Sequence, residues 1–182
     1  MKNTIKITCS GVISALAVVF MMATNIPITL YTVPCIVGIL FMIPAIEFGT
    51  KWGFMCYGIT AVLSAILPTE REALIVFIGI LGYYPILKML IERIGKKPIE
   101  YLIKFAVFNV SIVASYFVII KVLGYNVFAN EYAGWKVTAI ALLVAGNAVF
   151  AILDYAITNL IRLYFIKLRK PIRRILGLKG KY

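Results

Sequence analysis

The sequence contains no histidine, and its three cysteines stand singly. Cys9, Cys35 and Cys56 lie in separate apolar stretches and show no Cys-x-x-Cys spacing. Zinc and haem sites are usually built from His and Cys at short, regular spacings. We therefore expect no metal and no cofactor, and we interpret the cysteines as small buried residues.

Acidic residues are scarce as well, and this limits the chemistry open to the chain. Asp154 is the only aspartate, and no HExxH, GxSxG or Gly-rich phosphate loop is present. Intramembrane proteases need an Asp pair or a Ser/His pair, and no Ser of this chain sits beside a plausible base. We therefore expect that the protein is not an enzyme.

Apolar and basic residues are abundant instead. Hydrophobic residues make up 63% of the 182 residues, and the net charge is +12. A soluble fold of this length cannot bury so much apolar side chain, whereas a bilayer removes that constraint. Because the basic residues gather at the ends of apolar stretches, they suit lipid headgroups better than nucleic acid. We predict one transmembrane domain over residues 1–182 and no nucleic-acid partner.

Hydropathy predicts an all-α integral membrane protein, a bundle of about six transmembrane helices. A spanning helix needs about 20 mostly apolar residues. No small-residue cleavage site follows the first stretch, so we interpret it as a retained helix rather than a signal peptide. The close second and third stretches and the long sixth leave counts of five or seven open. The six stretches are residues 5–24, 30–48, 52–67, 73–94, 99–123 and 135–168.

Two prolines lie inside predicted spans. Pro44 falls in the second stretch and Pro85 in the fourth. Proline has no N–H to donate, so a carbonyl one turn earlier loses its partner and the helix bends or breaks. We expect interruptions near Leu40 and Leu81.

The distribution of Lys and Arg predicts that both termini are cytoplasmic. With the N-terminus inside, the cytoplasmic side collects Lys51, Lys96, Lys97 and a basic tail over residues 169–182. The opposite side keeps little beyond Arg71 and Lys136. Cytoplasmic loops carry the excess of basic residues, so the predicted topology is N-in and C-in.

Several polar side chains at membrane depth are candidates for substrate binding. Each must find a partner or face a cavity, because lipid offers no hydrogen bonds. They lie on the fourth to sixth predicted helices and could line one outward-opening cavity for a small planar or amphipathic solute. The alternative is that they tie helices together. The candidates are Tyr83, Tyr84, Asn109, Tyr116 and Asn147, with Arg71 as part of a possible lid just before the fourth helix.

Lys88 and Asp154 form a second candidate constellation. Both lie inside the predicted spans, toward the cytoplasmic ends of the fourth and sixth helices. An unpaired charge at such a depth is expensive, so we predict that the two pair with each other. The pair is either structural or a coupling site for an ion. Glu47 is an alternative partner for Lys88 or for Lys51.

The first predicted helix carries small residues on one side. Ser10, Gly11, Ser14 and Ala15 follow a small-xxx-small pattern, which lets another helix approach closely. We consider these residues a candidate docking face for a helix of this chain or of a partner.

The opening segment from Lys6 to Ala17, which includes Gly11-x-x-x-Ala15, is similar to the usual start of the substrate-binding S components of energy-coupling factor (ECF) transporters. Those proteins carry Ala-x-x-x-Ala in their first helix, so Gly11 departs from the motif. Size, hydropathy and predicted topology extend the resemblance along the whole chain.

The resemblance implies a multi-pass protein of a prokaryotic cell membrane that takes up a vitamin or similar micronutrient. The first helix would dock on a transmembrane T component, two cytoplasmic ATPase subunits would supply the energy, and the substrate site would lie in the outer half. Two alternatives remain: a stand-alone small transporter or channel that uses Lys88 and Asp154, and a structural or assembly protein.

Overall fold

The computed structural model describes residues 3–123 and 135–175, and every regular element in these two ranges is helical. The predicted loop 124–134 and the last tail residues, 176–182, lie outside the described residues. In chain order the elements are α1 (Asn3–Met22), η1 (Ala23–Asn25), η2 (Pro27–Thr29), α2 (Thr32–Leu40), α3 (Met42–Glu47), α4 (Thr50–Ile66), α5 (Arg71–Val76), η3 (Phe77–Leu81), α6 (Tyr84–Ile91), η4 (Glu92–Ile94), α7 (Lys97–Leu123), α8 (Trp135–Leu163), η5 (Tyr164–Leu168) and α9 (Arg169–Ile175).

Four helical stretches of the described chain are long and apolar enough to cross a membrane. They are Asn3–Asn25, Arg71–Ile94, Lys97–Lys121 and Leu143–Arg174. Thr32–Glu47 is apolar but shorter, and α4 has 17 residues. The six predicted stretches thus appear in order as helices, consistent with an all-α membrane protein, while the count of six spans stays a prediction.

The helices break where the prolines predict. α2 ends at Leu40, and α3 begins at Met42 just before Pro44. Farther along, the π-helical turn η3 ends at Leu81, and α6 begins at Tyr84 with Pro85 in its first turn. At this break the backbone of Leu81 packs closely against Gly38 of α2. A Cβ on Gly38 would lie 2.0 Å from the carbonyl oxygen of Leu81, so only glycine permits this approach.

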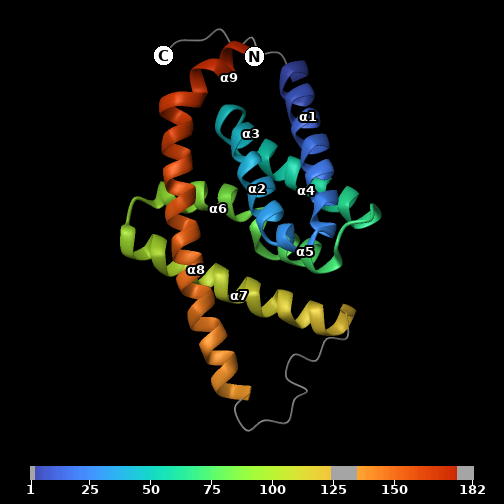
Figure 1. Cartoon of the computed structure of the whole chain (residues 1–182). Coiled ribbons are helices and arrows are strands. Elements are labelled where there is room, and N and C mark those ends of the chain that lie inside the picture. Colours follow the sequence, from blue (N-terminus) through green and yellow to red (C-terminus); the bar gives the residue numbers. More distant parts are fainter. Residues whose placement is uncertain (1–2, 124–134, 176–182) are drawn as a thin grey trace.

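The helices do not all run in one direction (Figure 1). α1 and α8 are roughly aligned in that view, whereas α6 and α7 run across them. The start of α1 and the whole of α9 lie at the same end of the molecule, an arrangement that the predicted N-in and C-in topology requires. The turn between α6 and α7 lies level with the middle of α8 instead. The topology itself stays a prediction.

Two apolar clusters hold the helices together. The first, around Phe41 and Phe77, joins α1, α2, α3, α4, η3 and α6, and the second, around Tyr84 and Phe150, joins α3, η3, α6, α7 and α8. Large apolar side chains remain exposed on the long helices, for example Leu102 and Val110 of α7 and Ile152 of α8. Exposed apolar surface on this scale is expected where lipid, rather than water, covers a helix.

Candidate functional site

Lys88 is the most deeply buried charged residue in the described part of the chain. It lies on α6, one turn after Tyr84, and its exposed fraction is 0%. Its ammonium contacts two carboxylates, Asp154 of α8 through Oδ1 and Glu92 of η4 through Oε1 at 2.8 Å. The structure therefore brings together Lys88 and Asp154, the two residues that the sequence analysis paired.

Lys104 of α7 completes a ring of charges around the same centre. Its Nζ lies 2.8 Å from Glu92 Oε1 and 3.2 Å from Asp154 Oδ2. Tyr84 adds a hydroxyl that donates to Asp154 Oδ1 at 2.6 Å. We call Tyr84, Lys88, Glu92, Lys104 and Asp154 the ion cluster. α6, η4, α7 and α8 each contribute at least one member.

The ion cluster contains two ammonium groups and two carboxylates, so its formal charge is zero. Each of the four charges contacts two charges of opposite sign. Burial of charge is costly unless every ion is paired and hydrogen-bonded, and this arrangement meets that condition. The cluster therefore fixes how α6, α7 and α8 meet.

Sequence reasoning missed Lys104 and Glu92 as members of the cluster. A signal for each was present: Glu92 is four residues after Lys88 and shares its helix face, and Lys104 lies inside a predicted span, where a charge needs a partner.

A groove between α7 and α8 opens beside the ion cluster. Its volume is about 330 Å³, near the lower end of the range for small-molecule sites. Aromatic rings form its walls, and Lys104 and Asp154 supply charged groups. The aromatic walls are Tyr101 and Phe105 on α7 and Phe150 and Tyr155 on α8. We call this the α7–α8 groove.

The α7–α8 groove lies on a different part of the helices from the site that the resemblance implies. Lys104 belongs to the first turns of α7, and Asp154 to the second half of α8. These are the ends predicted to be cytoplasmic, whereas the S-component resemblance implies a site in the outer half.

Two of the predicted substrate-binding residues bind each other. Asn109 of α7 and Asn147 of α8 exchange two side-chain hydrogen bonds of 3.0 Å each. Each amide also donates to the carbonyl four residues earlier in its own helix, Phe105 or Leu143, at 2.8 Å. The amide groups thus tie α7 to α8, as in the alternative interpretation.

Two of the other candidates have separate hydrogen-bond partners in the described part of the chain. The Tyr83 hydroxyl pairs with Ser111 Oγ at 2.7 Å, and Tyr84 belongs to the ion cluster. Arg71 is exposed at the start of α5, and Tyr116 is half-buried on α7.

The small residues of α1 divide between two faces. Ser10 and Ser14 are buried, and Cys56 of α4 donates its thiol to the Ser10 carbonyl at 3.6 Å. Gly11 and Ala15 are exposed on the other face, and a Cβ on Gly11 would meet nothing within 4 Å. The two serines thus serve contacts within the chain, whereas Gly11 and Ala15 remain open to a partner.

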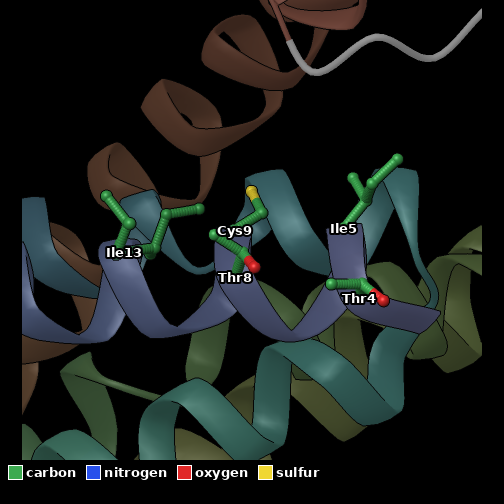
Figure 2. A pocket seen from close by; sticks show the side chains of 6 residues that line it. Thr4, Ile5, Thr8, Cys9 and Ile13 are labelled. Atoms are coloured by element: carbon green, nitrogen blue, oxygen red, sulfur yellow. The ribbon is translucent and has the colours of Figure 1, made fainter. Parts of the chain in front are cut away.

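A second groove, of about 360 Å³, runs beside the exposed face of α1. Figure 2 shows Thr4, Ile5, Thr8, Cys9 and Ile13 spaced along the first turns of the helix, and Val12 also lines the groove. Its lining is almost wholly apolar, so it could contact a partner through apolar packing but provides few hydrogen bonds.

Glu47 binds neither of the lysines considered for it. Its carboxylate lies 3.1 Å from Arg169 Nε and 3.5 Å from Arg173 Nε, and the Tyr164 hydroxyl donates to it at 3.3 Å. The suggested pairing with Lys88 or Lys51 is therefore replaced by a contact that holds α9 against the end of α3. The π-helical turn η5 connects α8 to α9, and the arginines of α9 reach Glu47 from there.

No three Asp, Glu or Cys residues in the described ranges come together in a way that could hold a metal ion. Comparisons with protein-family models, with curated proteins and with solved structures found no match.

Proposed function

We propose that this chain is the membrane-embedded, substrate-binding subunit of an uptake system of the ECF type. It binds a vitamin or similar small micronutrient in the cell membrane of a prokaryote. A transmembrane T component couples it to two cytoplasmic ATPase subunits, which supply the energy. The four long apolar helices support the membrane location, and the similarity of the Lys6–Ala17 segment to S components supports the class.

The observation that carries this proposal is that small residues lie on an exposed face of α1. Gly11 and Ala15 are exposed in the described part of the chain, whereas Ser10 and Ser14 on the same helix are buried. Lipid-facing positions are usually filled by large apolar side chains, whereas small residues on an exposed face let another helix approach closely. The outward face of α1 therefore suits a docked membrane partner.

Copurification tests the proposal. Affinity-tagged full chain, expressed in its own host and extracted in mild detergent, is expected to bring down one T component and two ATPase subunits, identified by mass spectrometry. A tagged chain that is well folded but never brings down an ATPase would overturn the proposal.

A stand-alone transporter is the second candidate, and the ion cluster is the observation that favours it. Buried ionisable groups in membrane proteins often mark ion or substrate pathways. Solute uptake into vesicles that contain this chain alone, driven by an ion gradient, would favour the second candidate over the first.

A further inference from the structure

We propose that the α7–α8 groove binds a small zwitterion with an apolar or aromatic body, such as an aromatic amino acid. The groove lies toward the ends of α7 and α8 that are predicted to be cytoplasmic, so this inference goes beyond the proposed uptake function and does not rest on it. It follows from three features of the groove: its aromatic walls, its paired charges of opposite sign, and the single contact made by Oδ2 of Asp154.

The aromatic walls select the body of the ligand. Phe150 lies with its ring centroid 5.5 Å from that of Phe105, and Tyr101 and Tyr155 stand at the exposed edge of the groove. Such rings favour a flat or apolar group, which they bury without needing a hydrogen bond. A volume of about 330 Å³ restricts the ligand to a small one.

The charged pair in the groove selects the polar end. Lys104 and Asp154 both line the groove, and their contact of 3.2 Å is the longest in the ion cluster. Asp154 Oδ1 already accepts from Lys88 and Tyr84, whereas Oδ2 contacts Lys104 alone. If the contact between Lys104 and Asp154 opens, Lys104 still contacts Glu92 at 2.8 Å, and Asp154 still accepts through Oδ1. Neither charge is then left unpaired.

A zwitterion can therefore replace that single contact with two. Its carboxylate would accept from Lys104, and its ammonium would donate to Asp154 Oδ2. The cluster stays neutral, because a zwitterion adds no net charge. A ligand with only one charge would form one new contact in place of the one that it breaks, whereas a zwitterion forms two, and this difference gives the site its selectivity.

Calorimetry with three matched ligands tests the inference on the purified full chain. L-Phenylalanine carries both charges, phenethylamine lacks the carboxylate, and 3-phenylpropionate lacks the ammonium. We expect L-phenylalanine to bind at least about tenfold more tightly than either analogue, as expected for one well-paired charged group. Absence of saturable L-phenylalanine binding, or equal binding of one analogue, would overturn the inference.

A variant at the edge of the groove avoids disturbing the ion cluster. Tyr155→Leu removes a wall residue that is 70% exposed, and we expect it to weaken L-phenylalanine binding several-fold. Phe117→Leu is the matched control, because Phe117 is 61% exposed on α7 but does not line the groove. Equal affinities of the two variants would place the ligand elsewhere and overturn the inference.

A zwitterionic lipid headgroup has similar chemistry, and lipid nanodiscs separate the two sources. We expect the same L-phenylalanine affinity in phosphatidylglycerol and phosphatidylethanolamine nanodiscs. Loss of binding only in phosphatidylethanolamine would assign the groove to the headgroup and overturn the inference. None of these results affects copurification with ATPase subunits, so the proposed function is tested separately.

Discussion

At the scale of single residues, the ion cluster shows how a largely apolar protein accommodates charge. Lys88 and Lys104 are buried and the two carboxylates are partly covered, yet each charge contacts two opposite charges. The stability of such a group depends on its completeness, because removing one member leaves another without compensation.

Lys88→Met is therefore expected to destabilise the fold strongly. The substitution preserves the length of the side chain but leaves two carboxylates facing one ammonium. We expect a loss of about 3–5 kcal/mol in the free energy of unfolding, measured by denaturant titration in mixed micelles.

Lys51→Met is the control for this substitution, since Lys51 is exposed on α4. Its effect should stay within about 0.5 kcal/mol, as for most surface substitutions. Equal stability of the two variants would contradict the view that the ion cluster holds α6, α7 and α8 together.

The sequence alone predicted two of the four charged members of the ion cluster. Lys88 and Asp154 could be paired because each is a charge at membrane depth with few partners available. Lys104 and Glu92 could not be assigned to the same centre, because hydropathy does not specify which faces of α6 and α7 meet. The Asn109–Asn147 pair was missed for the same reason, although each residue was singled out.

At the scale of helices, the interruptions within predicted spans allow the helices to pack closely. The π-helical turn η3 lies against α2, where Gly38 admits the carbonyl of Leu81. Sequence predicted the positions of the breaks, since proline acts locally on its own helix. The direction taken by α6 and α7 after the break depends on contacts between distant residues, which no local pattern specifies.

Gly38→Ala is expected to destabilise the protein by about 1–3 kcal/mol, because the added methyl group would clash with backbone atoms that have little room to move. Gly58→Ala on α4 is the matched control, since a Cβ at Gly58 meets nothing within 4 Å. The control should be neutral, or stabilising by up to about 1 kcal/mol through helix propensity. Thermal unfolding of both in the same detergent measures the difference, and a stabilising Gly38→Ala would contradict the close approach.

At the scale of the whole molecule, charge distribution and shape bear on how the chain sits in a membrane. The start of α1 and α9 share one end, and α9 is held there by Glu47 through Arg169 and Arg173. Lys96 lies in the turn between α6 and α7, and Lys97 is the first residue of α7; the positive-inside rule assigns both lysines to the cytoplasm. In Figure 1 this turn lies away from the end that the start of α1 shares with α9, so it is the most informative point at which to test the topology.

Cysteine labelling tests the topology. In a background with Cys9, Cys35 and Cys56 replaced by Ala, we expect an impermeant maleimide on intact cells to label Glu70→Cys but not Lys96→Cys. Both native residues are exposed, so access depends on the side of the membrane. Labelling of Lys96→Cys with protection of Glu70→Cys would reverse the predicted orientation.

Copurification of a matched pair of glycine variants tests the central claim most directly. Gly11→Leu fills the exposed small face of α1, whereas Gly58→Leu adds the same side chain to open space on α4. We expect that Gly58→Leu still brings down the T component and both ATPase subunits, and that Gly11→Leu, equally well folded, brings down none of the three. Retention of the full complex by Gly11→Leu would contradict docking through α1.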